Sequence, residues 1–295
     1  MSPMWQSYYT ADRIETALEL LARFGKRARI VAGATDLMLE LEQEVRPEVE
    51  ILIDVTRIPK QDLIWQDEAG WIHLGPMVTH NHCAGSQLIQ EQAFALARAC
   101  WEVGAPQIRN RGTIAGNLIT ASPANDSITP LMALGAQVRL RSSEAERVVP
   151  LENFYTGVRQ TVMQDQEMLI DISFPAPPAS SRSTFIKLGL RRAQAISVIN
   201  VALLATWAED EIQSATLTLG SVAPTIIHAS KAEAYLQGQQ LTPDVITQAA
   251  SLAAEAAKPI NDLRGSAAYR QEMGAGLRTT RLTRSGFGQG ATGCS

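Results

Sequence analysis

The spacing of hydrophobic positions at the start of the chain predicts a helix followed by a small parallel sheet. A helix capped by Thr10 is expected over residues 10–25, because apolar residues recur on one face: Ile14, Ala17, Leu18, Leu21 and Phe24. The apolar runs 28–32 and 51–55 predict buried strands, and a helical stretch over 37–45 separates them. This strand–loop–helix–strand order predicts a ligand at the carboxyl end of the first strand.

Shorter elements are predicted in the middle of the chain. Two strands are expected within 63–75, and helices follow over 79–89 and 92–103. Alternation of apolar and polar residues predicts further strands over 137–141 and 168–174.

The proline-rich stretch 175–181 separates these elements from a second set and predicts a linker with a domain boundary after residue 176. Beyond the boundary, antiparallel strands are expected over 184–190, 198–207 and 212–221. Helices are then expected over 229–236, 242–257 and 266–282. This order predicts an α+β domain over 177–284 with a three-stranded antiparallel sheet, and a flexible Gly-rich tail over 285–295.

Composition then excludes several classes of function. The 295 residues carry a net charge of −4 without a Lys/Arg run, which argues against nucleic-acid binding. No apolar run approaches the ~20 residues of a membrane span, and the N-terminus lacks the pattern of a signal peptide. The cysteines at 83, 100 and 294 form neither a disulfide framework nor a Cys-x-x-Cys metal site. We therefore expect a cytoplasmic protein without a metal centre of its own.

Two stretches rich in small and polar residues are the candidate ligand-binding loops. Residues 32–36 read Ala-Gly-Ala-Thr-Asp after a predicted strand, and 113–126 gather Gly, Asn, Ser and Thr before Asp126. Their backbone N–H groups can approach a polar ligand closely, so we expect the two loops to face each other across one cofactor. An ordinary connecting loop is an equal alternative for the first stretch, which matches neither the Walker nor the dinucleotide fingerprint.

Other polar motifs carry weaker signals. The G-x-G-x-x-G letters at 288–293 lack the preceding strand and following helix that a dinucleotide site needs. His80 and His82 would point to different faces of a helix, so a polar helix start is favoured over a metal site. Arg109 and Arg111 either hold a phosphate or pair with acidic neighbours. No Ser/His/Asp order or glycine elbow indicates nucleophilic catalysis, and we predict no catalytic acid or base.

Taken together, several motifs in order resemble one known family along nearly the whole chain. Residues 32–36 resemble its A-G-G-T-D loop, 107–117 its Q-I-R-N…T-I-G-G-N pattern, and 121–126 continue that pattern. Later matches fall at 154–157, 185–187, 191–192 and 220–224. The family is the FAD-binding medium subunits of the molybdenum hydroxylases, the xanthine dehydrogenase and carbon monoxide dehydrogenase type.

The resemblance implies a two-part FAD-binding domain over 1–176. A small parallel α/β subdomain would span about 1–57, a larger α+β subdomain about 58–176, and FAD would lie between them. The domain over 177–284 would be the family's small C-terminal domain. Both implications agree with the elements predicted from the residues.

The resemblance also assigns FAD contacts residue by residue. The family's first loop falls on Arg29, Ile30, Val31, Ala32, Gly33, Ala34, Thr35 and Asp36. Its second loop falls on Thr113, Ile114, Ala115, Gly116 and Asn117, and later contacts fall on Asp126, Leu169 and Lys187. Composition alone predicts that Lys187 is a solvated residue at a strand edge. The resemblance instead implies that Lys187 contacts FAD, where a cation near the flavin ring would raise the flavin potential. Ala34 and Ala115 stand where many relatives have glycine, and a methyl group disfavours positive φ and close backbone approach.

The implied function is that of an oxidoreductase subunit carrying FAD. Electrons from a molybdenum centre on a large subunit would pass through iron–sulfur clusters on a small subunit to this FAD, and then to an external acceptor. The resemblance implies a heterotrimer with these two partners, assembled as a dimer of heterotrimers. A stand-alone flavin-dependent oxidoreductase and a flavin-fold assembly protein without catalysis are the alternatives.

Overall fold

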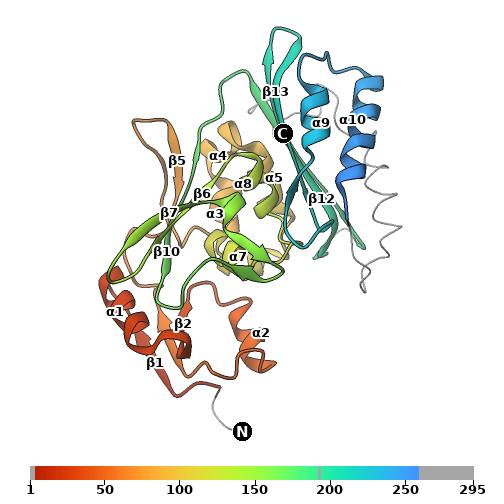
Figure 1. Cartoon of the computed structure of the whole chain (residues 1–295). Helices are drawn as coiled ribbons and strands as arrows, with labels where there is room; N and C mark the ends of the chain where they lie inside the picture. The colour runs from red at the N-terminus through yellow and green to blue at the C-terminus, as the bar shows by residue number, and fades with distance from the viewer. Residues whose placement is uncertain (1–3, 192–193, 259–295) are drawn as a thin grey trace.

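The computed structural model describes residues 4–191 and 194–258. Three sheets follow one another along the chain: a three-stranded sheet, a five-stranded sheet and a four-stranded sheet. Each forms one part of the molecule, and the N-terminal, middle and C-terminal parts are stacked in that order (Figure 1). The predicted α+β architecture is confirmed.

The N-terminal part is a parallel sheet with a helix on each face. Its strand order is β1-β3-β2, with β1 at Ser7–Thr10, β2 at Ala28–Val31 and β3 at Ile51–Asp54. Helix α1 (Ile14–Phe24), the 3-10 turn η1 (Gly25–Arg27) and α2 (Leu37–Glu42) connect the strands. Alternate side chains of β3 pack on opposite faces, Ile51 and Ile53 with the α1 cluster and Leu52 with the α2 cluster. Burial on both faces explains why this run is apolar throughout.

The start of α1 corrects the sequence prediction. Thr10 does not cap the helix, because it ends β1 and pairs with Asp54 of β3. Arg13 occupies the position before the helix, without a side-chain cap. Strand β1 is too short to give a periodic signal of its own, so its pairing could not be predicted.

The middle part packs helices on one face of an antiparallel sheet of order β4-β5-β10-β6-β7. The strands are β4 (Ile64–Gln66), β5 (Trp71–Leu74), β6 (Gln137–Arg141), β7 (Glu146–Pro150) and β10 (Met168–Pro175). The helices are α3 (His80–Gly85), α4 (Gln87–Gln92), α5 (Phe94–Glu102), α6 (Pro106–Arg111), α7 (Ile114–Thr120) and α8 (Ile128–Ala133). The 3-10 turn η2 (Leu151–Asn153) precedes a small hairpin of β8 (Tyr155–Gly157) and β9 (Gln160–Thr161).

The helix predicted over 79–89 is two helices. Ser86 ends α3 and caps α4, because its hydroxyl accepts a hydrogen bond from the N–H of Ile89 at 3.4 Å. A serine that can bond the backbone ahead of it favours a helix start over a helix interior.

The C-terminal part has a sheet of order β11-β12-β13-β14. Its strands are β11 (Ser181–Gly189), β12 (Ser197–Ala208), β13 (Glu211–Gly220) and β14 (Ile227–His228), and its helices are α9 (Ser230–Leu236) and α10 (Pro243–Ala256). The three long antiparallel strands match the prediction, and β14, with two residues, was too short to predict. The predicted helix over 266–282 and the tail over 285–295 lie outside the described residues.

The proline-rich stretch is less irregular than predicted. Pro175 pairs with Trp71 at the end of β10, and Ser181 pairs with Thr206 at the start of β11. The irregular segment between these strands is therefore shorter than 175–181. The domain boundary placed there stays a prediction.

The middle helices lie between two sheets. Helices α5 and α8 pack against the C-terminal sheet through a cluster of mostly small residues: Ala95, Ala99, Ala133, Phe185 and Ala202. Alanines let the helices approach the strands closely. The arrangement brings the middle part and β11–β13 into direct contact (Figure 1).

Thr242→Ala is expected to lower the free energy of unfolding by about 1 kcal/mol, because the Thr242 hydroxyl caps α10 by accepting from the N–H of Val245 at 3.3 Å. Chemical denaturation followed by circular dichroism measures the loss. Thr247→Ala in the same helix is the matched control, since among the described residues the Thr247 hydroxyl bonds only the carbonyl oxygen of Pro243. Equal losses in the two variants would contradict a capping role.

Candidate functional site

The loop between β2 and α2 presents backbone donors without protein partners. The N–H groups of residues 33–36 donate to no protein acceptor in the part of the chain that the structure describes. Ala34 within this loop has φ +61°, in the left-handed region. Successive N–H groups around such a residue can converge on an anion. The loop can therefore bind a negatively charged or polar ligand through its backbone.

Gly33 brings this loop into contact with the chain that precedes α7. A Cβ atom added at Gly33 would lie 2.1 Å from the carbonyl oxygen of Arg111 and 3.0 Å from Cα of Gly112. Only glycine allows two backbones to approach this closely. The two stretches singled out from the sequence are thus neighbours in the fold.

The second stretch begins a helix, which corrects its prediction as a loop. The Thr113 hydroxyl caps α7 by accepting from the N–H of Gly116 at 3.0 Å. Ile114 and Leu118 are fully buried on one face of the helix. Burial and capping outweigh the low helix propensities of Gly116 and Asn117, which favoured a loop at the sequence level.

Asp36 ends the first loop. Burial, followed by Glu40, raises the pKa of Asp36, and Arg159 is the largest of the groups that oppose the shift, ahead of the Thr120 side chain of α7. The Thr120 hydroxyl itself donates to the carbonyl oxygen of Gly116 at 2.9 Å. The contact that joins the first loop to the chain before α7 is therefore the backbone approach at Gly33.

Asp126 is the centre of a buried polar network between the middle and C-terminal parts. Its Oδ2 lies 2.5 Å from Nζ of Lys187, and its Oδ1 accepts from the Ser197 hydroxyl at 2.5 Å and the Asn200 amide at 3.3 Å. Lys187 also donates to the carbonyl oxygen of Glu102 at 3.1 Å. The side chains of Asp126 and Lys187 are each 6% exposed, so Lys187 is not the solvated residue that composition indicated.

This network continues to α7. Ser127, which follows Asp126 in the chain, donates a hydrogen bond from its hydroxyl to Oδ1 of Asn117 at 2.6 Å. Burial raises the pKa of Asp126, and Lys187 is the largest of the groups that oppose the shift. Asn117, Asp126 and Lys187, which are far apart in sequence, thus belong to one region of the fold.

The remaining predicted contacts lie in strands. Leu169 of β10 is buried in the same hydrophobic cluster as Ile114 and Leu118 of α7. Arg29 to Val31 form the end of β2 that leads into the first loop, and burial is the main cause that lowers the pKa of Arg29. Contact of these residues with a cofactor stays a prediction.

Arg109 does not pair with an acidic neighbour among the described residues. Its guanidinium donates to Oδ1 of Asn81 at 3.1 Å and to the carbonyl oxygens of Val103 and Gly104, and it lies over the ring of Trp101 at 4.8 Å. It therefore fixes the turn before α6, and a contact of Arg109 or Arg111 with a phosphate stays a prediction.

Three polar residues of the region escaped the sequence analysis: Thr120, Ser197 and Asn200. Asn200 interrupts the apolar run of β12, and it is fully buried. A polar residue inside a buried strand needs a hydrogen-bonding partner. That interruption is the one signal in the sequence that pointed to the network.

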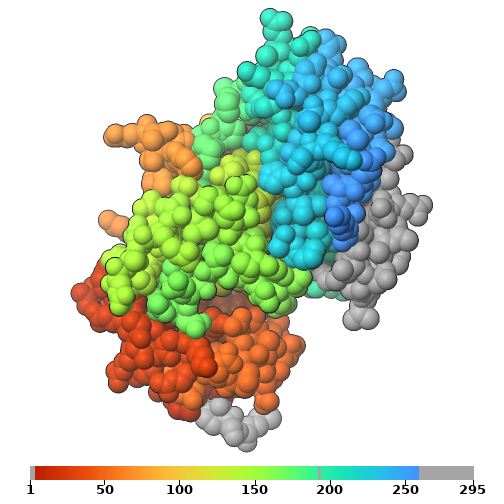
Figure 2. Space-filling model, in the orientation of Figure 1, coloured from red at the N-terminus to blue at the C-terminus, as the bar shows by residue number. Residues whose placement is uncertain are grey.

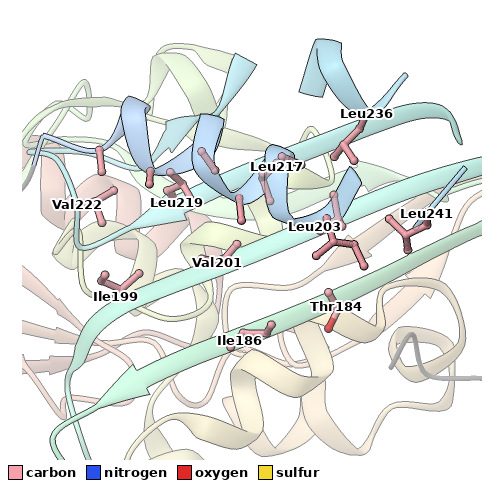
Figure 3. Close-up of a pocket in the computed structure, with 16 residues that line it drawn as sticks. Thr184, Ile186, Ile199, Val201, Leu203, Leu217, Leu219, Val222, Leu236 and Leu241 are labelled. Carbon is pink, nitrogen blue, oxygen red and sulfur yellow. The ribbon is translucent and has the colours of Figure 1, made fainter. Parts of the chain in front are cut away.

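An apolar cavity of about 60 Å³ lies outside this region. Strands β11–β13 and helices α9 and α10 of the C-terminal part line it, and none of the predicted site residues does (Figure 3). In the space-filling view the surface is recessed where the N-terminal part meets the middle part (Figure 2).

Within the described residues, no group of three His, Cys, Asp or Glu side chains is placed to hold a metal ion. None of the described helices has the length and hydropathy of a membrane span.

Comparison with known proteins identifies similar chains. The model of the FAD-binding domain in molybdopterin dehydrogenase matches residues 3–177, and that of the CO dehydrogenase flavoprotein C-terminal domain matches 184–284. The carbon monoxide dehydrogenase medium chain of Hydrogenophaga pseudoflava is 28% identical over 273 residues, covering 92% of this chain and 94% of the relative. A subunit of the 6-hydroxypseudooxynicotine dehydrogenase complex of Paenarthrobacter nicotinovorans is 30% identical, with 92% of each chain covered.

A solved structure shows the same arrangement. Reconstituted CO dehydrogenase from Oligotropha carboxidovorans superimposes with a TM-score of 0.88 at 29% identity, covering 94% of this chain and 96% of that one. A match of this extent includes all three parts of the described fold.

Gly33→Ala is expected to destabilise the protein by about 1–3 kcal/mol, because the added Cβ overlaps the backbone at Arg111. Thermal unfolding measures the effect. The control is Gly85→Ala in α3, where a Cβ meets nothing within 4 Å. A Gly33→Ala protein as stable as the control would show that the two backbones are not in contact.

Ala34→Gly is expected to raise the free energy of unfolding by about 0.5–1 kcal/mol, because glycine adopts the left-handed φ of this position without a steric penalty. Ala84→Gly, inside α3, should instead lower it by about 0.5–1 kcal/mol. Denaturant titration of both variants measures the sign of each change in the free energy of unfolding. A loss at both positions would contradict the strained conformation of Ala34.

Proposed function

Because this chain belongs to the family of FAD-binding medium subunits of the molybdenum hydroxylases, we propose that it carries electrons through its FAD. The electrons come from iron–sulfur clusters on a small partner subunit and pass to an external acceptor. The molybdenum cofactor belongs to a large partner subunit, which selects the substrate. FAD supplies the redox chemistry, and the protein supplies binding, orientation and electrostatics.

The loop at residues 33–36 is the observation that carries this proposal. Its unpartnered N–H groups offer donors for the pyrophosphate of FAD, and the close contact at Gly33 holds them beside α7. A backbone site of this kind fits an anionic cofactor. Since the family's cofactor is FAD, the residues present fit the group that the family requires.

The proposed site combines the residues that the resemblance assigns to FAD. Arg29 to Asp36 and Thr113 to Asn117 hold the pyrophosphate and its neighbouring sugar groups. Asp126 and Lys187 pair where the middle part meets the C-terminal part, and Leu169 lies in the hydrophobic core that α7 shares. We name no catalytic acid or base in the site, because the redox chemistry belongs to the cofactor.

The buried pairing of Lys187 changes the role proposed for its charge. A free cation near the flavin ring would raise the flavin potential, but Asp126 lies 2.5 Å away and offsets much of that charge. We propose that the pair first joins the C-terminal sheet to the FAD-binding part. The electrostatic field at the flavin is then the small net field of the two opposite charges, those of Asp126 and Lys187.

The relatives indicate the partners proposed for this chain. The relatives are medium chains and FAD subunits of dehydrogenase complexes, which supports a small and a large partner for this chain. We propose a dimer of heterotrimers in the cytoplasm.

Purification of the complex from its host, followed by visible spectroscopy and identification of the released flavin, tests the function. We expect a yellow protein with one FAD per chain that co-purifies with iron–sulfur and molybdenum subunits. A colourless chain that takes up no added FAD would rule the function out. A yellow chain that never associates with such subunits would instead favour a stand-alone flavin oxidoreductase.

Lys187→Met is expected to lower the free energy of unfolding by about 3–5 kcal/mol, because it leaves the Asp126 carboxylate buried without its counter-charge. The flavin midpoint potential should fall by on the order of tens of millivolts. Denaturation and spectroelectrochemical titration measure the two effects.

The double variant Asp126→Asn/Lys187→Met is the matched control, since it removes both charges together. It should recover most of the lost stability. Unchanged FAD occupancy and unchanged midpoint potential in Lys187→Met would remove any role of this lysine at the flavin.

A further inference from the structure

A buried chain of hydrogen bonds leads from helix α8 to Asp126. The hydroxyl of Thr129 in α8 lies 2.6 Å from Oδ1 of Asn200 in β12, and Nδ2 of Asn200 lies 3.3 Å from Oδ1 of Asp126. Thr129 and Asn200 are both fully buried. Because a buried amide that loses one partner is left with an unsatisfied atom, the two bonds of Asn200 stabilise one arrangement together.

The charge of Asp126 fixes the direction of these bonds. Nζ of Lys187, 2.5 Å from Oδ2 of Asp126, favours the ionised form of the carboxyl. An ionised carboxylate only accepts hydrogen bonds, so the amino group of Asn200 faces Asp126 and its carbonyl oxygen faces Thr129. The Thr129 hydroxyl is therefore the donor. Hydrogen bonds that run in one direction polarise one another, so this bond strengthens the one that Asn200 donates to Asp126.

Gly220 of β13 leaves the space in which the bond between Thr129 and Asn200 forms. A Cβ atom added at Gly220 would lie 2.1 Å from Oδ1 of Asn200 and 2.6 Å from Oγ1 of Thr129. These two oxygens are the atoms that the bond joins. Because Asn200 and Gly220 are opposite each other on paired strands, a side chain at position 220 would displace the carboxamide. The bond therefore requires glycine at this position.

We propose that Thr129 is a positioning residue for the flavin site, which acts through Asn200 to hold Asp126 in place as an FAD contact. The inference rests on the proposed function, in which Asp126 is one of the FAD contacts. Asn200 and Ser197 of β12 donate to one oxygen of Asp126. Lys187 of β11 donates to the other. Thr129 adds α8 to this set of elements, and it acts on the cofactor only through Asp126.

Thr129→Val tests the role of the hydroxyl. Valine has nearly the shape of threonine, so the change removes the donor and leaves Oδ1 of Asn200 unpaired. We expect the FAD dissociation constant of the flavin-depleted chain to rise about 3- to 10-fold. Thr129→Ser keeps the donor, and it should bind FAD within about twofold of the original chain. Fluorescence titration with FAD measures the constants, and equal constants for the Val and Ser variants would overturn the proposal.

Thr218→Val is the matched control, because it makes the same change at a neighbouring hydroxyl that is also fully buried. Among the described residues, the Thr218 hydroxyl donates only to the backbone carbonyl oxygens of Thr129, at 2.8 Å, and Ala202, at 3.5 Å. We expect Thr218→Val to lower the melting temperature in calorimetry, as Thr129→Val does, and to keep the FAD dissociation constant within about twofold. If Thr218→Val weakens FAD binding as much as Thr129→Val, the role of Thr129 is packing alone and the proposal is overturned.

A second background separates action through Asp126 from an independent effect. The double variant Asp126→Asn/Lys187→Met lacks the carboxylate that Asn200 holds. In this background Thr129→Val should change the FAD dissociation constant by less than about twofold, because interacting residues are not additive. An equal fold-change in both backgrounds would show that Thr129 acts independently of Asp126, contrary to the proposal.

These results distinguish the inference from the function on which it rests. An original chain that takes up no FAD would contradict the proposed function itself. If the original chain binds FAD and Thr129→Val binds it equally well, only the role of Thr129 is overturned. If Thr129→Val does not fold, Thr129→Ala takes its place beside Thr129→Ser, and equal affinities of these two variants would overturn that role.

Discussion

The backbone contact at Gly33 is the constraint on which the rest of the site depends. A side chain at this position would overlap the carbonyl oxygen of Arg111, so the approach of the two segments requires a glycine. Because the contact lies just before α7, it holds the first loop beside the start of this helix. The loop's own N–H groups have no acceptor among the described residues, since the anchoring is done by backbone packing. One residue thus couples the N-terminal sheet to the middle part and leaves the donors unpaired.

The Asp126–Lys187 pair couples the middle part to the C-terminal part in a different way. Burying two charges is expensive, and their mutual attraction offsets that cost only when further hydrogen bonds satisfy the remaining atoms. Ser197 and Asn200 of β12 and the carbonyl oxygen of Glu102 at the end of α5 supply those bonds. The pair therefore forms only when β11, β12 and α5 are all in place. Such a network favours one relative position of the two parts, which a cofactor site built from both would need.

The sequence predicted the long periodic elements and the approximate location of the site, but not the contacts inside it. Strands such as β12 and helix α10 carry enough residues for a clear pattern, and Thr242 and Pro243 marked the helix start correctly. The stretch at Thr113 was misjudged because its helix is short and its stability comes from the burial of Ile114 and Leu118. The burial of Lys187 could not be predicted either, because its partners come from distant segments of the chain. Resemblance to a family grouped these residues, whereas composition and periodicity alone did not.

Ala34 shows how the fold tolerates an alanine where the resemblance to the family predicts glycine. An alanine at φ +61° carries a steric penalty of about 1–2 kcal/mol. Such a conformation persists only when the surrounding structure determines it, and here the neighbouring Gly33 is packed against the backbone at Arg111 and Gly112. The strain is therefore localised at one residue of a loop whose N–H groups have no acceptor among the described residues. The left-handed geometry is thus reached with alanine, at a cost in the stability of the loop and without loss of its donors.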